Sequence, residues 1–167
     1  WDVTGTPLTA SAVVTSAINC FGGTAVVAVS ASGGTAPYHG TGSQNSVAGT
    51  WSFTVSDDNG CTATSNSLVI TEPSKVLGST SSTPSTCGNP NGSATVTASG
   101  GTGGYTYLWS NGQTAATASA LMPASYTVTI TDGYGCTGTA SETVSLSGSS
   151  VGAAGPISGA AGACRNS

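Results

Sequence analysis

The sequence predicts an all-β protein made of tandem small antiparallel β-sandwich modules of the Ig-like kind, each with one disulfide. Three observations predict it. Thr and Val are abundant whereas strong helix formers are few, and β-branched residues favour strands. Apolar and polar residues alternate in several short segments separated by turn signals, which is typical of sandwiches. Finally, one pattern of residues occurs twice along the chain.

The repeat is clearest around a glycine pair. Residues 31–35, ASGGT, recur as residues 98–102, and a cysteine precedes each copy at the same distance. Farther along, residues 51–61 align with residues 126–136. The offset between the copies rises from 67 to 75, which indicates an eight-residue insertion within residues 108–118.

This alignment divides the chain into two modules and two flanks. We expect residues 8–74 and 75–148 to be the two β-sandwich repeats. Residues 1–7 are expected to be the end of a preceding module or a linker. Residues 149–167 are expected to be a linker and the start of a further Ig-like domain.

The strands follow from alternation with a period of two. In one copy Tyr126, Val128 and Ile130 alternate with threonines, so the apolar side chains share the inward face. The same reasoning applies to residues 51–55 and 105–109. Aromatic side chains at these positions are therefore predicted to pack in the core rather than to stack on sugar rings: Trp51, Phe53, Tyr105, Tyr107, Trp109 and Tyr126.

Charge is scarce, and this excludes several partners. Charged residues make up 5% of the chain, against about 25% in an ordinary domain. The only basic residues are Lys75 and Arg165, too few to track phosphates or to bind an anionic membrane surface. No apolar run approaches the roughly 18 residues of a membrane helix. We therefore expect no nucleic-acid partner and no membrane insertion.

Five cysteines, with no CxxC pair and a single histidine, favour disulfides over a zinc site. Pairing Cys20 with Cys61 and Cys87 with Cys136 gives the same bond in both repeats, so we predict these two bridges. Cys164 is left over, either for a cysteine elsewhere or for a link between chains. Disulfides persist outside the cytoplasm, which predicts an extracellular protein.

Catalytic and metal-binding residues are hard to find. Asp57 and Asp58 are weak calcium candidates, but the second copy keeps only Asp132, and a hairpin turn explains the Asp-Asn-Gly pattern better. His39 is the only histidine and has no nucleophile elbow beside it. We expect no catalytic residues, no cofactor and no bound metal.

These motifs resemble the SprB repeat, a family found in secreted and cell-surface adhesins of Bacteroidetes. The resemblance rests on Cys20, ASGGT at 31–35, the segment from Gly49 to Cys61, and ITEP at 70–73. The second copy adds the Tyr-Tyr-Trp-Ser pattern at 105–110. In the first copy His39-Gly40-Thr41 replaces that pattern, which predicts a shortened hairpin there. The resemblance implies type IX secretion, surface display and a role in adhesion or gliding.

The function expected is therefore structural: a repeat segment in the stalk of a surface adhesin. An alternative is a subunit of a self-assembling extracellular filament, because strand edges without charge are poorly protected against pairing. A third is a glycan-binding module. The partners expected are neighbouring repeats or like subunits, with surface glycans as a further candidate.

Overall fold

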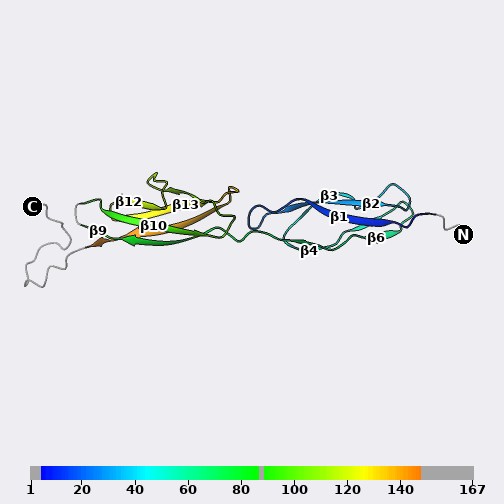
Figure 1. The fold of residues 1–167 in the computed structure, drawn as a ribbon, viewed down its shortest axis with the longest axis horizontal. Coiled ribbons are helices and arrows are strands. Elements are labelled where there is room, and N and C mark those ends of the chain that lie inside the picture. Colours follow the sequence, from blue (N-terminus) through cyan, green and yellow to red (C-terminus); the bar gives the residue numbers. More distant parts are fainter. Residues whose placement is uncertain (1–4, 87–88, 148–167) are drawn as a thin grey trace, which may run out of the picture. The chain divides into compact units, whose positions relative to one another are not determined.

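The computed structural model describes residues 5–86 and 89–147, and every regular element among them is a β-strand, so the all-β prediction is confirmed (Figure 1). The chain divides into two compact units, residues 1–74 and residues 75–167. We call their described parts repeat 1 and repeat 2. Neither contains a helix that could span a membrane.

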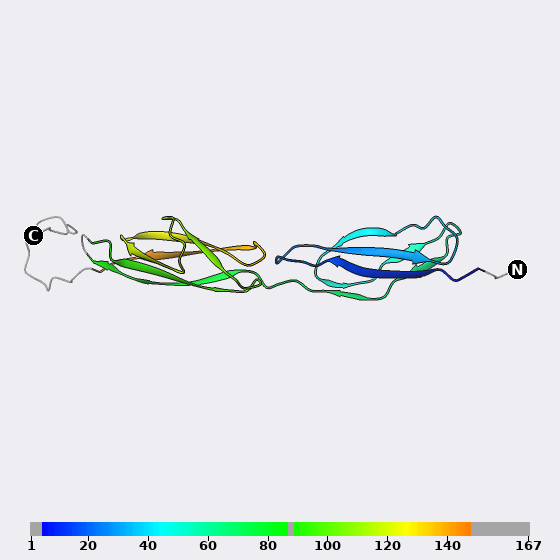
Figure 2. The ribbon, with the colours of Figure 1, turned by 45° about the horizontal axis from the view of Figure 1, so that its top comes forward.

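Repeat 1 has one three-stranded sheet and two short strand pairs, all antiparallel. The sheet has the order β1-β2-β3, and β4 pairs with β7 while β5 pairs with β6. The strands are β1 (Thr9–Ser16), β2 (Ala25–Ser32), β3 (Gly42–Ser46), β4 (Gly49–Trp51), β5 (Thr54–Ser56), β6 (Thr62–Thr64) and β7 (Leu68–Ile70). The β1–β2 layer and the β4 layer face each other (Figure 2).

Repeat 2 has two three-stranded antiparallel sheets, with the orders β12-β10-β8 and β11-β13-β14. Its strands are β8 (Leu77–Thr83), β9 (Ser85–Thr86), β10 (Gly92–Ser99), β11 (Thr106–Trp109), β12 (Thr117–Leu121), β13 (Ala124–Thr131), β14 (Thr137–Val144) and β15 (Leu146–Ser147). The short pair β9 and β15 is parallel, which the antiparallel prediction did not include.

Each repeat has its own core, formed by the inward positions of both layers. β2 and β10 bury the same alternate positions, for example Val27 and Val29 in β2 and Ala94 and Val96 in β10. The core of repeat 1 consists of Ala12, Ile18, Ala25, Val27, Val29, Val55 and Ile70. The core of repeat 2 consists of Val76, Ala94, Val96, Trp109, Ala118, Leu121, Val128, Ile130 and Val144.

The eight-residue insertion explains the main difference between the repeats. In repeat 2 it extends β11, which pairs with β13, and the turn that follows. In repeat 1 this strand is reduced to a single bridge between His39 and Ser56. These residues correspond to Thr106 and Thr131, so the hairpin is shortened where the sequence predicted it.

Outward strand positions carry hydroxyl groups that bond across neighbouring strands. Ser11 and Ser30 oxygens lie 2.9 Å apart between β1 and β2, and Thr95 and Thr117 oxygens lie 2.9 Å apart between β10 and β12. A further pair, Thr83 and Ser93, is 2.8 Å apart. Cross-strand hydroxyl bonds thus join neighbouring strands on a surface that has few charged side chains.

Candidate functional site

The hairpin turn after β5 is organised by the carboxylate of Asp57. Its Oδ1 accepts hydrogen bonds from the backbone amides of Asn59 at 3.1 Å and Cys61 at 2.8 Å. Its Oδ2 accepts the backbone amide of Thr35 at 3.0 Å. One buried carboxylate therefore joins the ASGGT loop to the hairpin turn that ends at Cys61.

Repeat 2 builds the same arrangement around Asp132. Oδ1 accepts the backbone amides of Tyr134 at 3.0 Å and Cys136 at 2.8 Å. Oδ2 accepts the backbone amide of Thr102 at 3.0 Å and its hydroxyl at 3.1 Å. We call each carboxylate with its amide donors an aspartate clasp.

The clasp explains why a glycine occupies the fourth position of ASGGT. Gly34 has φ +55° and Gly101 has φ +61°, a backbone conformation that side chains disfavour. A Cβ on Gly34 would lie 2.6 Å from Oδ2 of Asp57, and one on Gly101 would lie 2.4 Å from Oδ2 of Asp132. The loop can approach the carboxylate this closely only without a side chain.

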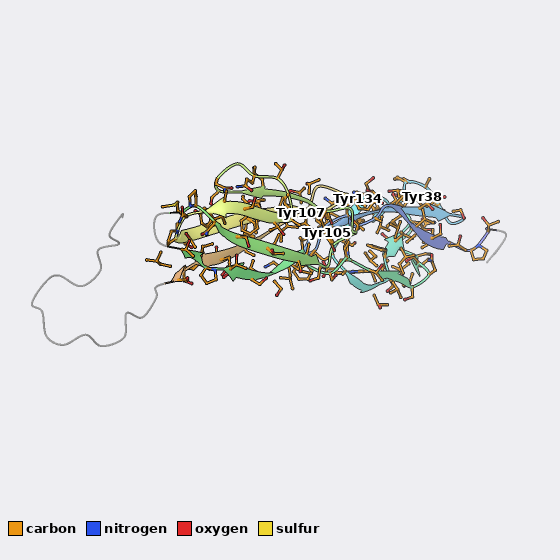
Figure 3. All side chains as sticks on the ribbon, turned by 60° about the vertical axis from the view of Figure 1, so that its left-hand side comes forward. Tyr38, Tyr105, Tyr107 and Tyr134 are labelled. Atoms are coloured by element: carbon orange, nitrogen blue, oxygen red, sulfur yellow. The ribbon has the colours of Figure 1, made fainter. Side chains whose placement is uncertain are left out.

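A tyrosine side chain also forms a hydrogen bond to the ASGGT loop in each repeat. The Tyr38 hydroxyl donates to the carbonyl oxygen of Gly33 at 2.7 Å, and the Tyr105 hydroxyl donates to that of Gly100 (Figure 3). The tyrosine after ASGGT is thus part of the loop's hydrogen-bond network in both repeats.

These hydrogen bonds stabilise the ionised carboxylates. The amide of Thr35 contributes most to lowering the pKa of Asp57, and the bonds from Cys61 and Asn59 add to it against the opposing effect of burial. For Asp132, burial is the largest single effect and acts to raise the pKa, but the bonds from Cys136, Thr102 and Tyr134 together outweigh it, so the pKa is lowered.

The geometry assigns the Asp57 carboxylate to the turn rather than to calcium. Both of its oxygens accept amides of the chain, while Asp58 is exposed and its own amide donates to the carbonyl of Thr35 at 2.9 Å. Among the described residues, no three His, Cys, Asp or Glu side chains are grouped as a metal site would require.

The predicted disulfides are corrected by the structure. Cys61 is exposed and has a free thiol, so the bond from Cys20 to Cys61 is wrong. Cys20 and Cys136 are each in a disulfide. The predicted bond within repeat 1 therefore fails. The predicted partner of Cys136, Cys87, lies outside the described residues, as do Cys164, residues 1–4 and residues 148–167.

The physical reason is that the two cysteines of repeat 1 lie at opposite ends of it. The turn that begins at Cys20 is held where the chain leaves the repeat, because the Gly22 amide donates to Oε2 of Glu72 at 2.6 Å. The clasp at Cys61 is held where the chain enters, because the Gly34 amide donates to the carbonyl of Thr6 at 2.8 Å. A disulfide cannot bridge the length of a strand.

The predicted core aromatics differ in their surroundings. Trp109 is 1% exposed in the core of repeat 2, whereas Trp51 is 39% exposed, so its placement in the core is wrong. Trp51 ends the three-residue strand β4, and its Nε1 donates to the carbonyl of Val47 on the outside of the repeat. Partly buried aromatics packed against the two cores are Phe53, Tyr105, Tyr107 and Tyr126.

The sequence analysis did not predict the aspartate clasp, although it identified both of the segments that form it. The ASGGT motif and the later aspartate were each recognised as repeated, but as separate turns. The signal available in the sequence was that both segments recur in the same order. Two turns that contact each other in every repeat are expected to keep their residues in every repeat.

Comparison with known protein families identifies part of repeat 2. The SprB repeat family model matches residues 79–114, which run from β8 through β11 of repeat 2. No curated protein matches the chain significantly. Residues 79–114 therefore match the SprB repeat, a family that suggests a repeat segment of a Bacteroidetes cell-surface protein with an extracellular location.

Proposed function

We propose that the chain is a passive structural segment of a secreted cell-surface adhesin, a stalk that carries a binding tip away from the cell. In this proposal export follows the type IX route, the partners are neighbouring repeats, and the segment has no catalytic activity. The observation that carries it is the aspartate clasp, present with the same donors in both repeats.

The clasp supports a structural role because its carboxylate oxygens and backbone amides bond to each other and so are not available to a ligand. Asp57 and Asp132 are buried, and their carboxylate oxygens accept amides of their own repeat. Glu142 likewise accepts the Ser82 hydroxyl at 2.9 Å. Glu72 accepts the Gly22 amide at 2.6 Å, so four of the six acidic side chains hold strands and turns together.

A second candidate, the filament subunit, is favoured by the exposed edge of β1, where Val13 is 56% exposed. Strand addition at such an edge would join chains. Asn66 opposes it, because its side-chain amide both accepts from the Ala12 amide at 3.0 Å and donates to the Ala12 carbonyl at 3.2 Å. This side chain already occupies the backbone groups that an incoming strand would need.

Antibodies raised against the full chain test the stalk proposal on intact cells of the source bacterium. We expect them to label the cell surface without blocking attachment, and we expect the purified chain to bind nothing on a glycan array. Saturable binding to one glycan would replace the stalk with a glycan-binding module. Uniform fibres of this chain in electron micrographs of native material would replace it with the filament subunit.

A further inference from the structure

Repeat 1 lacks most of a strand that repeat 2 has. In repeat 2, β11 runs along one side of β13, where Leu108 pairs with Thr129. Thr54 of β5 is the residue of repeat 1 that corresponds to Thr129. On this side of β5 the only pairing among the described residues is the bridge between His39 and Ser56. The position beside Thr54 that β11 would occupy is therefore open.

The backbone groups of Thr54 point into this open position. On one side of β5 the Phe53 carbonyl oxygen accepts the Ser65 amide at 2.8 Å, next to β6. On the other side the Ser56 amide donates to the His39 carbonyl oxygen at 3.0 Å. Successive residues of a strand bond to opposite sides, so the amide and carbonyl of Thr54 face the same side as those of Ser56. Thr54 is exposed there.

The open position exists because the chain leaves the sheet early in repeat 1. Gly40 has φ +80°, and a Cβ on it would lie 2.6 Å from the carbonyl oxygen of Thr54. Two residues later, at Gly42, the chain begins β3. In repeat 2 the insertion within residues 108–118 instead lets β11 continue to Trp109 before the chain turns back into β12.

The side chains at this position are less covered than their equivalents. In repeat 2, Trp109 pairs with Val128, and Val128 is 0% exposed in the core. Phe53 replaces Val128 in repeat 1 and is only partly buried. Ser46 takes the strand position of Leu121, so that end of the core is also less bulky. An apolar side chain opposite Phe53 would cover its ring as Trp109 covers Val128.

The surroundings define what an incoming strand can carry. Residues 31–56 contain no Asp, Glu, Lys or Arg, so a charged side chain facing inward would find no counter-ion. Trp51, two residues before Phe53, is 39% exposed, and Val47 is 51% exposed. The Trp51 Nε1 donates to the Val47 carbonyl at 2.9 Å, which holds the two side by side. Apolar side chains at alternate positions of an added strand would therefore face Phe53 and then Trp51.

We propose that repeat 1 accepts, beside Thr54, an extended uncharged segment of a partner protein with aromatic or apolar side chains at alternate positions. The segment adds a strand where repeat 2 has its own β11. Hydrogen bonds to the Thr54 backbone give affinity, and contacts with Phe53 and Trp51 give specificity. The inference goes beyond the stalk proposal, because a passive stalk needs no strand-accepting edge.

The probe is the peptide Leu-Trp-Ser-Val-Thr with both ends blocked, which copies residues 108–110 and continues the alternation. It is titrated into the isotope-labelled full chain and followed by NMR. We expect saturable shifts centred on the amides of Ser52 and Thr54, and hydrogen exchange at the Thr54 amide slowed by roughly tenfold or more. The control peptide Leu-Ser-Ser-Ser-Thr, whose inward positions are serines, should cause neither.

Two variants of the full chain place the peptide. Thr54→Pro removes the amide that faces the open position, and it leaves the bond between Phe53 and Ser65 in place. It should weaken peptide binding roughly tenfold, as one lost hydrogen bond does, whereas Thr54→Val should bind as the unmodified chain does. Inserting a copy of residues 109–116 between Thr41 and Gly42 should fill the position from within and abolish binding. Circular dichroism checks that each variant is folded.

The proposal is overturned if saturating peptide shifts no amide near Thr54, or if the serine peptide binds equally well. Binding to Thr54→Pro as tight as to Thr54→Val, or undiminished binding to a folded insertion variant, would also overturn it. Protection of the Thr54 amide that grows with chain concentration in the absence of peptide would replace the partner with a second copy of the chain. None of these results bears on surface labelling of cells, so failure here is separable from failure of the stalk proposal.

Discussion

The backbone amide of Cys136 donates a 2.8 Å hydrogen bond to the carboxylate of Asp132, and the amide of Cys61 makes a bond of the same length to Asp57. Cys136 is in a disulfide whereas Cys61 is a free thiol. The clasp therefore forms whether or not its cysteine is bonded, and it belongs to the fold of the single repeat.

Acid should weaken both clasps. The folded pKa of Asp57 and of Asp132 is lowered, so their contribution to stability is complete above the unfolded pKa, about 4, and is lost as the pH falls through the folded value. We expect the thermal midpoint, followed by circular dichroism, to be level between about pH 5 and 7 and to fall below about pH 4.

The matched controls for that experiment are asparagine variants. The double variant Asp57→Asn with Asp132→Asn should have a lower thermal midpoint at neutral pH and lose most of the acid dependence. The part that remains is due to Glu142, because hydrogen bonds from Thr80 and Ser82 also lower the pKa of this carboxyl group. Exposed Asp58→Asn should keep the full dependence. An unchanged acid profile in the double variant would show that the clasps do not cause it.

The glycines of repeat 2 separate backbone strain from a clash with the clasp. Gly101 and Gly103 both have positive φ, but a Cβ on Gly101 meets Asp132 whereas one on Gly103 meets nothing within 4 Å. Gly103→Ala should lower the free energy of unfolding by about 1–2 kcal/mol. Gly101→Ala should lower it by roughly 1–3 kcal/mol more. Equal losses in urea titrations would contradict a clasp that excludes a side chain.

The two tryptophans offer a second matched pair, because each indole Nε1 donates to a backbone carbonyl at 2.9 Å. They differ in burial. Trp109→Ala should lower the free energy of unfolding by about 3–5 kcal/mol, as expected for a core aromatic. Exposed Trp51→Ala should lower it by about 1 kcal/mol. Similar losses for both would mean that the two rings bury similar apolar area.

The sequence was sufficient to predict what depends on local pattern. Alternation placed Val128 and Ile130 inward, and the missing Tyr/Trp pattern predicted the shortened hairpin at His39. The sequence was insufficient where the burial of a side chain depends on segments that are far apart along the chain. Trp51 continues the alternation, but its three-residue strand leaves the ring partly exposed.

The disulfide prediction for repeat 1 failed for a related reason. The pairing of Cys20 with Cys61 fits the recurrence of the cysteines along the chain, but Cys61 has a free thiol. The sequence does not show that the turn at Cys20 lies beside Glu72 whereas the clasp at Cys61 lies beside Thr6, at the other end of the repeat.

The paired hydroxyls between strands have a consequence for the salt dependence of the structure. Ion pairs on a surface weaken as dissolved salt screens them, whereas a bond between two neutral hydroxyls, such as those of Ser11 and Ser30, carries no net charge to screen. A surface held together by such bonds should keep its geometry in both dilute and concentrated salt, which would suit the extracellular location that we propose.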